Sequence, residues 1–319
     1  MKAAYLDSYG IASNIVIKDV SKPVPKGDQV LVKVMASTVT SGNVKLRNFK
    51  GMSTFYKVMG RLAFGIFKPR QKIIGSEYAG IVEAIGPKVT LFKIGDKVYG
   101  LELFGANADY LCTSQSKVTK MPKCSYEEAA CLPFGCGTAY QAINDYKDKS
   151  VLINGISGCV GLYALQLCTL NNCKVTGVCS TKNKQLVMET GCERVIDYTK
   201  EDVFMDKEQF DVILDTIGNM TYPTTRQLLK PTGHFVTILP EFTDFFKSAT
   251  GQQKIACVMA SDKVSINEEI NKLVNDKKIK SVIGDRFELD SIVKAHELVE
   301  SGHKVGSTVI IVDKEYNKG

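Results

Sequence analysis

The segment that most constrains the fold of this chain is VLINGISGCVG, residues 151–161. Its apolar residues end in a glycine turn, which is typical of a buried parallel strand that leads into a helix. Gly155, Gly158 and Gly161 have the G-x-x-G-x-x-G spacing of a nucleotide-binding turn. In such a turn Gly155 takes the required backbone angles and Gly158 lets a pyrophosphate approach the main chain, while Gly161 lets the helix pack closely on the strand.

The residues around this turn strengthen the prediction. Residues 160 to about 170 are expected to form a helix whose N-terminal amides and partial positive charge point at the phosphates. A glycine turn alone is a weak signal, because purely structural turns share it. Here a second expected strand, residues 174–179, follows as a dinucleotide-binding unit requires. The sequence therefore predicts a dinucleotide site that includes Gly155, Ser157, Gly158, Cys159 and Val160.

The composition is ordinary for a soluble globular protein of about two domains. The chain has 319 residues, of which 44% are hydrophobic and 24% are charged. No apolar run is long enough to span a membrane, and the N-terminus reads as a strand. The ten cysteines form no C-x-x-C pair, and the positive charges that give a net +7 are spread along the chain. We therefore expect a cytoplasmic protein with free thiols and no membrane partner, and nucleic-acid binding is a minor alternative.

The pattern of elements changes along the chain. Residues 1–122 read as short strands, for example at 30–36, 80–86, 97–100 and 108–111. From about residue 125 helices and strands alternate, which is typical of a parallel, doubly wound sheet. The expected helices are residues 127–132, 138–145, 183–190, 221–229, 267–275 and 289–301, and the later strands are residues 194–196, 211–215, 234–239, 254–259 and 308–312. The predicted domains are residues 1–122 with 279–319, and residues 123–278.

Five motifs outside the glycine turn are specific when taken together. They are IGSEYAGIVEAIG (74–86), FKIGDKV (92–98), GTAY (137–140), DVILDTIG (211–218) and AHELVESGH (295–303). With them the chain resembles the zinc-independent quinone oxidoreductase branch of the medium-chain dehydrogenase/reductase superfamily. The resemblance implies an α/β fold, in which a Rossmann domain with a doubly wound parallel sheet accompanies a GroES-like, mostly β domain. It also implies hydride transfer from a nicotinamide cofactor to a quinone or an α,β-unsaturated carbonyl.

The resemblance bears on the metal content as well. Zinc-dependent relatives have a histidine ligand where this chain has Ser76, and a serine hydroxyl is a poor zinc ligand. The four closely spaced cysteines of a structural zinc lobe are also missing between residues 86 and 110. His296 is assigned to packing or to the surface. We therefore expect reduction without metal, with hydrogen-bond donors stabilising the developing enolate or hydroquinone oxygen.

Two residues match family positions near the nicotinamide, and a third, Tyr56, follows the same basic stretch as a family tyrosine but at a different spacing. Thr138 matches a threonine whose hydroxyl faces the carboxamide, although it could instead bond to its own helical turn. Asn43 lies where many relatives have an aspartate next to the ribose or substrate, and it could equally be an ordinary turn asparagine. Tyr56 is a candidate proton donor or stacking group, with packing as the alternative. Asn43 and Tyr56 are the catalytic candidates.

Further cofactor contacts are expected where parallel strands end, because ligands bind at the carboxyl ends of such strands. Ile217 is expected beside the ribose, and Val236, Thr237 and Ile238 near the nicotinamide. The loop of residues 240–252 contains three phenylalanines, which would cover the site or form a dimer contact.

The residues at the end of the second expected nucleotide-domain strand, residues 174–179, indicate whether the cofactor is NADPH or NADH. This strand ends CSTKNK (179–184), without the carboxylate that an NAD-specific fold places there to bind the ribose hydroxyls. We therefore expect NADPH, with Ser180 donating to the 2′-phosphate and Lys182 or Lys184 supplying charge. Tyr198 resembles a family tyrosine that closes over the same pocket. Ser180 could instead cap the next helix, and the lysines could be solvated surface.

The leading hypothesis is an NADPH-dependent reductase of a quinone or enone. An enoyl-thioester reductase, or a noncatalytic, crystallin-like protein that keeps the cofactor site, are the alternatives. A homodimer is also expected, because the apolar strand at 254–259 would otherwise leave a sheet edge unpaired.

Overall fold

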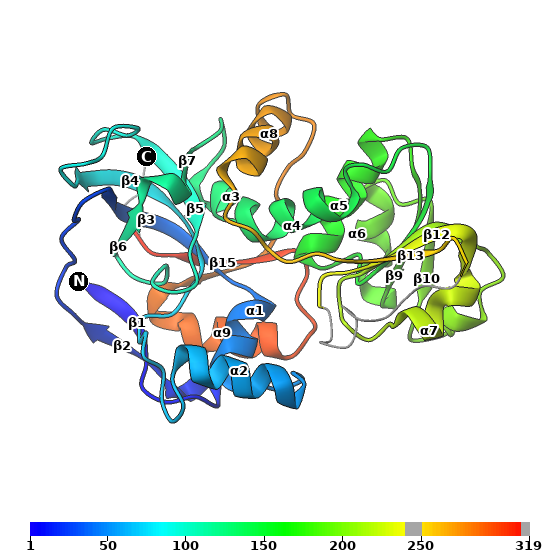
Figure 1. The fold of residues 1–319 in the computed structure, drawn as a ribbon, viewed down its shortest axis with the longest axis horizontal. Helices are drawn as coiled ribbons and strands as arrows, with labels where there is room; N and C mark the ends of the chain where they lie inside the picture. The colour runs from blue at the N-terminus through cyan, green and yellow to red at the C-terminus, as the bar shows by residue number, and fades with distance from the viewer. Residues whose placement is uncertain (240–250, 314–319) are drawn as a thin grey trace. The chain divides into compact units, whose positions relative to one another are not determined.

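The computed structural model describes residues 1–239 and 251–313. The chain divides into two compact units, each with its own sheet (Figure 1). Unit 1 consists of Met1–Phe134, Asp262–Asn275 and Ile283–Gly319, and unit 2 of Gly135–Ser261 and Asp276–Val282.

Unit 1 is built on a mostly antiparallel sheet. The strand order is β14-β15-β3-β4-β5-β7, and β6 also pairs with β3. These strands are β3 (Gln29–Val39), β4 (Glu77–Ile85), β5 (Lys97–Leu101), β6 (Tyr110–Ser114), β7 (Val118–Lys120), β14 (Ile283–Glu288) and β15 (Ser307–Ile311). A separate antiparallel pair joins β1 (Lys2–Leu6) to β2 (Ile15–Asp19).

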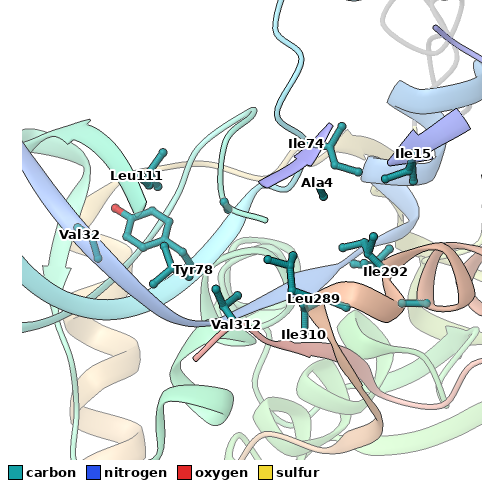
Figure 2. Close-up of a cluster of buried hydrophobic side chains, with 14 of the residues drawn as sticks. Ala4, Ile15, Val32, Ile74, Tyr78, Leu111, Leu289, Ile292, Ile310 and Val312 are labelled. Carbon is teal, nitrogen blue, oxygen red and sulfur yellow. The ribbon is translucent and has the colours of Figure 1, made fainter. Parts of the chain in front are cut away.

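The core of unit 1 lies between this sheet and helix α9 (Ile292–Glu300). Figure 2 shows Leu289 at the start of this helical segment beside Ile310 and Val312 at the last strand. On the central strands, Tyr78 is fully buried in the same cluster. Apolar residues from the two ends of the sequence therefore form one core.

Two helices of unit 1 were not expected, because the sequence indicated a mostly β region before residue 122. Helix α1 (Ser41–Asn48) begins with a capping box between Thr40 and Asn43. Helix α2 (Thr54–Phe64) begins at Ser53, whose hydroxyl accepts from a backbone amide of the first turn. The expectation was wrong for these residues, and the two N-caps are the signals that could have found the helices.

The unit boundaries differ from the expected domain boundaries after residues 122 and 278. Helices α3 (Tyr126–Ala130) and α8 (Val264–Asn275) belong to unit 1. Helix α8 is tied to β7 through Asn267, whose Nδ2 donates to Thr119 Oγ1 at 3.1 Å. Long-range contacts of this kind, which a composition shift cannot reveal, place both helices with the first sheet.

Unit 2 contains a six-stranded parallel sheet with the order β10-β9-β8-β11-β12-β13. The strands are β8 (Ser150–Asn154), β9 (Lys174–Cys179), β10 (Arg194–Asp197), β11 (Phe210–Asp215), β12 (Leu229–Thr237) and β13 (Lys254–Cys257). From β8 the chain moves outward to β10, then returns to β11 on the other side. This is the doubly wound Rossmann arrangement, and its switch point lies between β8 and β11. The expected α/β fold is confirmed.

The helices of unit 2 are α4 (Gly137–Ile143), α5 (Cys159–Leu170), α6 (Lys184–Glu189) and α7 (Tyr222–Thr225). The helix expected at 221–229 was wrong in length, because a 3-10 turn, Arg226–Leu228, follows α7 and Leu229 already begins β12. The physical reason is sheet pairing, because Leu229 pairs with Phe210 of β11 and so cannot continue the helix. No helix in the described part of the chain is both long enough and apolar enough to cross a bilayer.

Candidate cofactor site

The turn after β8 has the geometry that two of its glycines require. The φ angle of Gly155 is +77°, and a Cβ there would lie 2.5 Å from Ile217 Cδ1. A Cβ on Gly161 would lie 2.5 Å from the Gly155 carbonyl oxygen and 2.6 Å from Ile156 Cα. Helix α5 therefore packs directly on the turn, and a side chain at Gly161 would force the two apart, whereas a side chain at Gly155 would collide with the loop after β11.

Gly158 leaves the start of α5 open. Its backbone angles (φ −78°, ψ 172°) are extended, and a Cβ there would meet only the Gly155 oxygen, at 3.2 Å. As the N-cap it offers no side-chain acceptor, and the first turn of the helix contains no acidic residue. The amides of Cys159, Val160 and Gly161 are the first of the helix, and such amides have no intrahelical acceptor. This helix end is suited to an anion.

The turn is linked to the loop that follows β9. Ser157 Oγ accepts a hydrogen bond from Asn183 Nδ2 at 3.0 Å, and both side chains are buried. The Ser157 hydroxyl proton is still available for a ligand oxygen. The loops after β8 and β9 therefore lie together at the carboxyl edge of the sheet.

The residues expected at the 2′-phosphate follow β9 and β10. Ser180 comes directly after β9 and is partly exposed, and its side chain does not cap the 3-10 turn Thr181–Asn183. Lys184 begins α6 and is exposed. Tyr198 follows β10, with 56% of its surface exposed, and its amide donates to the Cys179 carbonyl at 3.2 Å. The alternative, in which the Ser180 side chain caps the next helical turn, is therefore not observed.

One carboxylate near this loop was missed by the sequence reasoning. Asp197, the last residue of β10, accepts hydrogen bonds from the Thr181 hydroxyl and from Thr199 Oγ1 (2.6 Å) and N (3.1 Å). The Thr181 and Thr199 hydroxyls lower the pKa of Asp197 to about 2, so it is ionised at neutral pH. Asp197 stands opposite Cys179 in the strand register. Its proximity depends on the pairing of β10 with β9, which periodicity alone does not give.

A buried aspartate shapes the loop after β11. Asp215 is fully buried and accepts from the amides of Ile217, Gly218 and Met220, each at 3.1 Å. Asn154 Nδ2, at the end of β8, donates to the same carboxylate at 2.8 Å. The loop is therefore held rigidly, with the Ile217 side chain 53% exposed beside the glycine turn. Asp215 is a positioning residue that the sequence motif contained but that the predicted site omitted.

The end of β12 is more enclosed than expected. Val236 and Thr237 are buried within the strand, and the Thr237 carbonyl accepts from the Val258 amide at 2.9 Å. Ile238 follows the strand and is partly exposed. The loop expected to cover the site spans residues 240–252. Its residues 240–250, which include the three phenylalanines, lie outside the described residues.

Thr138 has a buried hydroxyl that no described residue satisfies. The residue is 1% exposed, and its Oγ1 has no hydrogen-bond partner, so it does not bond back to its own helical turn. It lies in α4, directly after a π-helical turn, Leu132–Cys136, and such turns are frequent at functional sites. An unsatisfied buried hydroxyl costs about 1–3 kcal/mol. A ligand amide would satisfy it, so Thr138 fits the carboxamide of a nicotinamide.

In unit 1, Asn43 first has a structural role. Its Oδ1 accepts from Thr40 N at 2.9 Å and from Thr40 Oγ1 at 3.0 Å, which closes the capping box of α1. Its Nδ2 donates to Ser76 Oγ at 2.5 Å and keeps one further N–H for a ligand. Asn43 also lines a pocket of unit 1 with Phe64 and Phe104. Tyr56 lies in the first turn of α2, its ring 5.7 Å from that of Phe55, and it is not among the residues lining this pocket.

Ser76 accepts a hydrogen bond from an amide at the position where zinc-dependent relatives have a ligand. In residues 1–239 and 251–313, no group of three or more His, Cys, Asp and Glu residues is placed to hold a metal ion.

His296 is a packing residue of α9 rather than a surface one. It is 1% exposed, and neither ring nitrogen has a partner among the described residues. Burial, assisted by the neighbouring Arg47 guanidinium, lowers its pKa to about 3, although the Glu300 carboxylate opposes this. Arg47 is itself buried and is bound to Glu300. This ion pair joins α1 to α9, and it supports the fold of unit 1.

Comparisons with known proteins agree with this architecture. Residues 26–144 match the family model of the alcohol dehydrogenase GroES-like domain, and residues 190–310 match that of the zinc-binding dehydrogenases. The mitochondrial NAD(P)H oxidoreductase RTN4IP1 of Danio rerio is 29% identical, with 98% of this chain and 91% of that protein covered. The 2-methylene-furan-3-one reductase of Solanum lycopersicum is 28% identical, with coverages of 97% and 79%. The structure of the quinone oxidoreductase from Coxiella burnetii is 28% identical, with a TM-score of 0.87 and coverages of 98% and 99%.

The chain therefore belongs to the medium-chain dehydrogenase/reductase superfamily, in its quinone oxidoreductase-like branch. The expected pairing of a GroES-like domain with a Rossmann domain is confirmed. The relatives are oxidoreductases, which supports a general oxidoreductase role and a nicotinamide cofactor for this chain.

Proposed function

We propose that this protein is an NADPH-dependent oxidoreductase that reduces quinones or α,β-unsaturated carbonyl compounds without a metal ion. The observation that carries the proposal is the arrangement at the carboxyl edge of the unit 2 sheet. There the open N-terminus of α5, the loop with Ser180 and the rigid loop after β11 meet around one glycine turn. Few arrangements other than a dinucleotide site would need all three.

In this proposal the chain's own groups hold each part of the cofactor. The α5 amides and the Ser157 hydroxyl bind the pyrophosphate, because they are donors that a diphosphate can use. Ile217 and Ile238 contact the ribose and the nicotinamide ring, and the unsatisfied Thr138 hydroxyl binds the carboxamide. When bound, the nicotinamide supplies the hydride.

The choice of NADPH over NADH rests on charge. No carboxylate follows β9, so a dianionic 2′-phosphate would meet the Ser180 hydroxyl and the ammonium of the exposed Lys184. Asp197 is the one nearby acid on β10, and its oxygens already accept from three threonine groups. Its carboxylate is therefore engaged mainly by its own loop.

Substrate activation without metal would use hydrogen bonds. The free N–H of Asn43 can donate to a substrate carbonyl oxygen, where negative charge develops during reduction. Tyr56 is proposed as the proton donor to the reduced product. The serine at position 76, already bonded to Asn43, supports a metal-free site because it is a weak ligand.

The experiment measures NADPH and NADH oxidation with a panel of quinones, alkenals and enoyl thioesters. Ser180→Asp should lower kcat/KM for NADPH at least about tenfold relative to NADH, since even about 1.4 kcal/mol of repulsion gives that factor. Ser180→Ala is the matched control that removes the hydroxyl without adding charge. An unchanged cofactor ratio in Ser180→Asp would contradict the cofactor assignment. NADPH binding without turnover of any acceptor would favour the noncatalytic alternative.

A further inference from the structure

Helix α2, labelled in Figure 1, has apolar residues that are exposed to solvent. Val58, Met59 and Leu62 are 48–53% exposed, and no residue of this helix is buried. At 100° per residue these three side chains fall within about 100° of arc, so they form one face. A surface helix normally turns such a face to the core. The outward apolar face therefore calls for a partner.

The orientation of α2 is set by the opposite face of the helix. A Cβ on Gly60 would lie 2.6 Å from the ring of Phe49, so only a glycine allows this close approach. Phe64 packs edge-on against Phe104, with ring centroids 5.3 Å apart. All four residues belong to unit 1. These contacts hold the helix with its apolar face outward.

The apolar face continues into the turn after the helix. Gly65 has a φ of +122°, and the Arg70 amide donates to the Phe64 carbonyl at 2.8 Å, which closes a tight loop. At the tip of this loop Ile66 is 52% and Phe67 is 89% exposed. We call these two residues together with Val58, Met59 and Leu62 the apolar ridge. The ridge ends in a projecting phenylalanine.

Basic residues adjoin the C-terminal end of the apolar ridge. Between Asp28 and Glu77 the sequence contains nine lysines and arginines and no acidic residue. Lys68 and Arg70, which follow Ile66 and Phe67 in the sequence, are exposed and form no salt bridge with any acidic residue in the described part of the chain. Their charge is therefore available to an anionic partner next to the ridge.

We propose that the apolar ridge docks on the surface of a lipid bilayer that contains anionic lipids. A helix with an apolar face and basic flanks lies in the plane of the interface, with its apolar side chains among the acyl chains. Lysine and arginine bind the anionic headgroups. A fluid bilayer also accepts a projecting Phe67, for which a protein partner would need a matching pocket. The expectation of no membrane partner rested on the lack of a spanning segment, which interfacial binding does not require. The proposal is independent of the oxidoreductase activity.

The chain contains no tryptophan, so a single introduced tryptophan reports on one position. In Phe67→Trp the emission should shift to the blue with vesicles of phosphatidylcholine and phosphatidylserine, and much less with phosphatidylcholine alone. High salt should reverse the shift, because it screens the headgroup attraction. Met205→Trp is the matched control, since Met205 is 78% exposed but lies in unit 2. Its emission should not change.

Flotation of the whole protein with the same vesicles measures the partition coefficient. Lys68→Gln and Arg70→Gln should each lower it about fivefold, the factor expected for loss of one cation near an anionic surface. Lys207→Gln, an exposed lysine of unit 2, should leave it unchanged. Thermal unfolding and NADPH binding check that each variant is folded.

Three results would overturn the proposal. The first is no binding of the wild-type protein to anionic vesicles at low salt. The second is equal binding by the wild type and the Lys68→Gln/Arg70→Gln double variant. The third is a blue-shifted emission of Phe67→Trp before any vesicle is added, because protein would then cover the apolar ridge. In that case the mass in solution distinguishes a second copy from a segment of the same chain.

Discussion

Two glycines of the cofactor turn should respond very differently to the same small substitution, alanine. At Gly161 the new methyl group would lie 2.5 and 2.6 Å from two backbone atoms, Gly155 O and Ile156 Cα. At Gly158 the nearest atom would be 3.2 Å away, and the backbone angles suit alanine. We therefore expect Gly161→Ala to affect stability, and Gly158→Ala to affect cofactor binding.

The magnitudes follow from these distances. Because backbone atoms cannot rotate away, Gly161→Ala must displace α5 or the turn, and overpacking of this kind costs about 1–3 kcal/mol. The better helix propensity of alanine returns up to about 1 kcal/mol, so the net loss should be about 1–2 kcal/mol. For Gly158→Ala, the lower entropy of the unfolded chain offsets the small cost at the N-cap. Its free energy of unfolding should change by less than about 0.5 kcal/mol.

The assay pairs urea unfolding, followed by circular dichroism, with NADPH binding, followed by nicotinamide fluorescence. Gly158→Ala should raise the Kd for NADPH about tenfold or more, because its methyl group occupies the approach of the pyrophosphate to the main chain. Wild-type NADPH affinity in Gly158→Ala would refute the placement of the phosphates. Wild-type stability in Gly161→Ala would refute the packing argument.

Three further predictions follow from other features of the structure. Activity should survive prolonged EDTA treatment, since the ligand position holds Ser76; about one zinc per chain, lost together with activity, would contradict this. The protein should be a homodimer paired through β13, the outermost strand of the described unit 2 sheet, and light scattering that gives the mass of one chain at micromolar concentration would count against it. Stability should also fall below pH 6.5, because the unfolded chain then takes up a proton that buried His296, with its pKa of about 3, does not bind. The slope from this group approaches about 1.4 kcal/mol per pH unit and ends near pH 3, and His296→Leu should remove it from urea unfolding curves measured at pH 7 and pH 5.

The sequence predicted the nucleotide-binding unit well because its signals are local. The glycine spacing determines the turn, and alternating strands and helices determine a parallel sheet whose carboxyl ends share one edge. Those two facts are enough to place Gly155, Ser180 and Ile217 at one edge, where the structure also has them. Whether these residues bind a cofactor stays a prediction.

Other features of the candidate site could not be read from the sequence because they depend on what a side chain contacts. The Thr138 hydroxyl lacks a partner among the described residues, a property of its surroundings that residue type does not reveal. Asp197 comes near the loop after β9 only through the pairing of β10 with β9. The sequence left Asn43 between a structural turn role and a contact with the ribose or substrate. The structure shows the structural role directly, as the capping box of α1, and leaves one N–H of the side chain for a ligand.

Helix α2 illustrates a deeper limit of periodicity. The spacing of Phe55, Val58, Met59 and Leu62 shows that an apolar face exists, but it gives no direction to that face, and the usual assumption is that it points inward. Here the direction depends on Gly60, because the helix can approach Phe49 closely only where it has no side chain. The basic residues beside it were equally hidden, since a net charge of +7 over 319 residues conceals a stretch with no acid between Asp28 and Glu77. In this helix, a local excess of basic residues and a glycine on the side opposite the apolar face are the two sequence features that accompany the outward direction of that face.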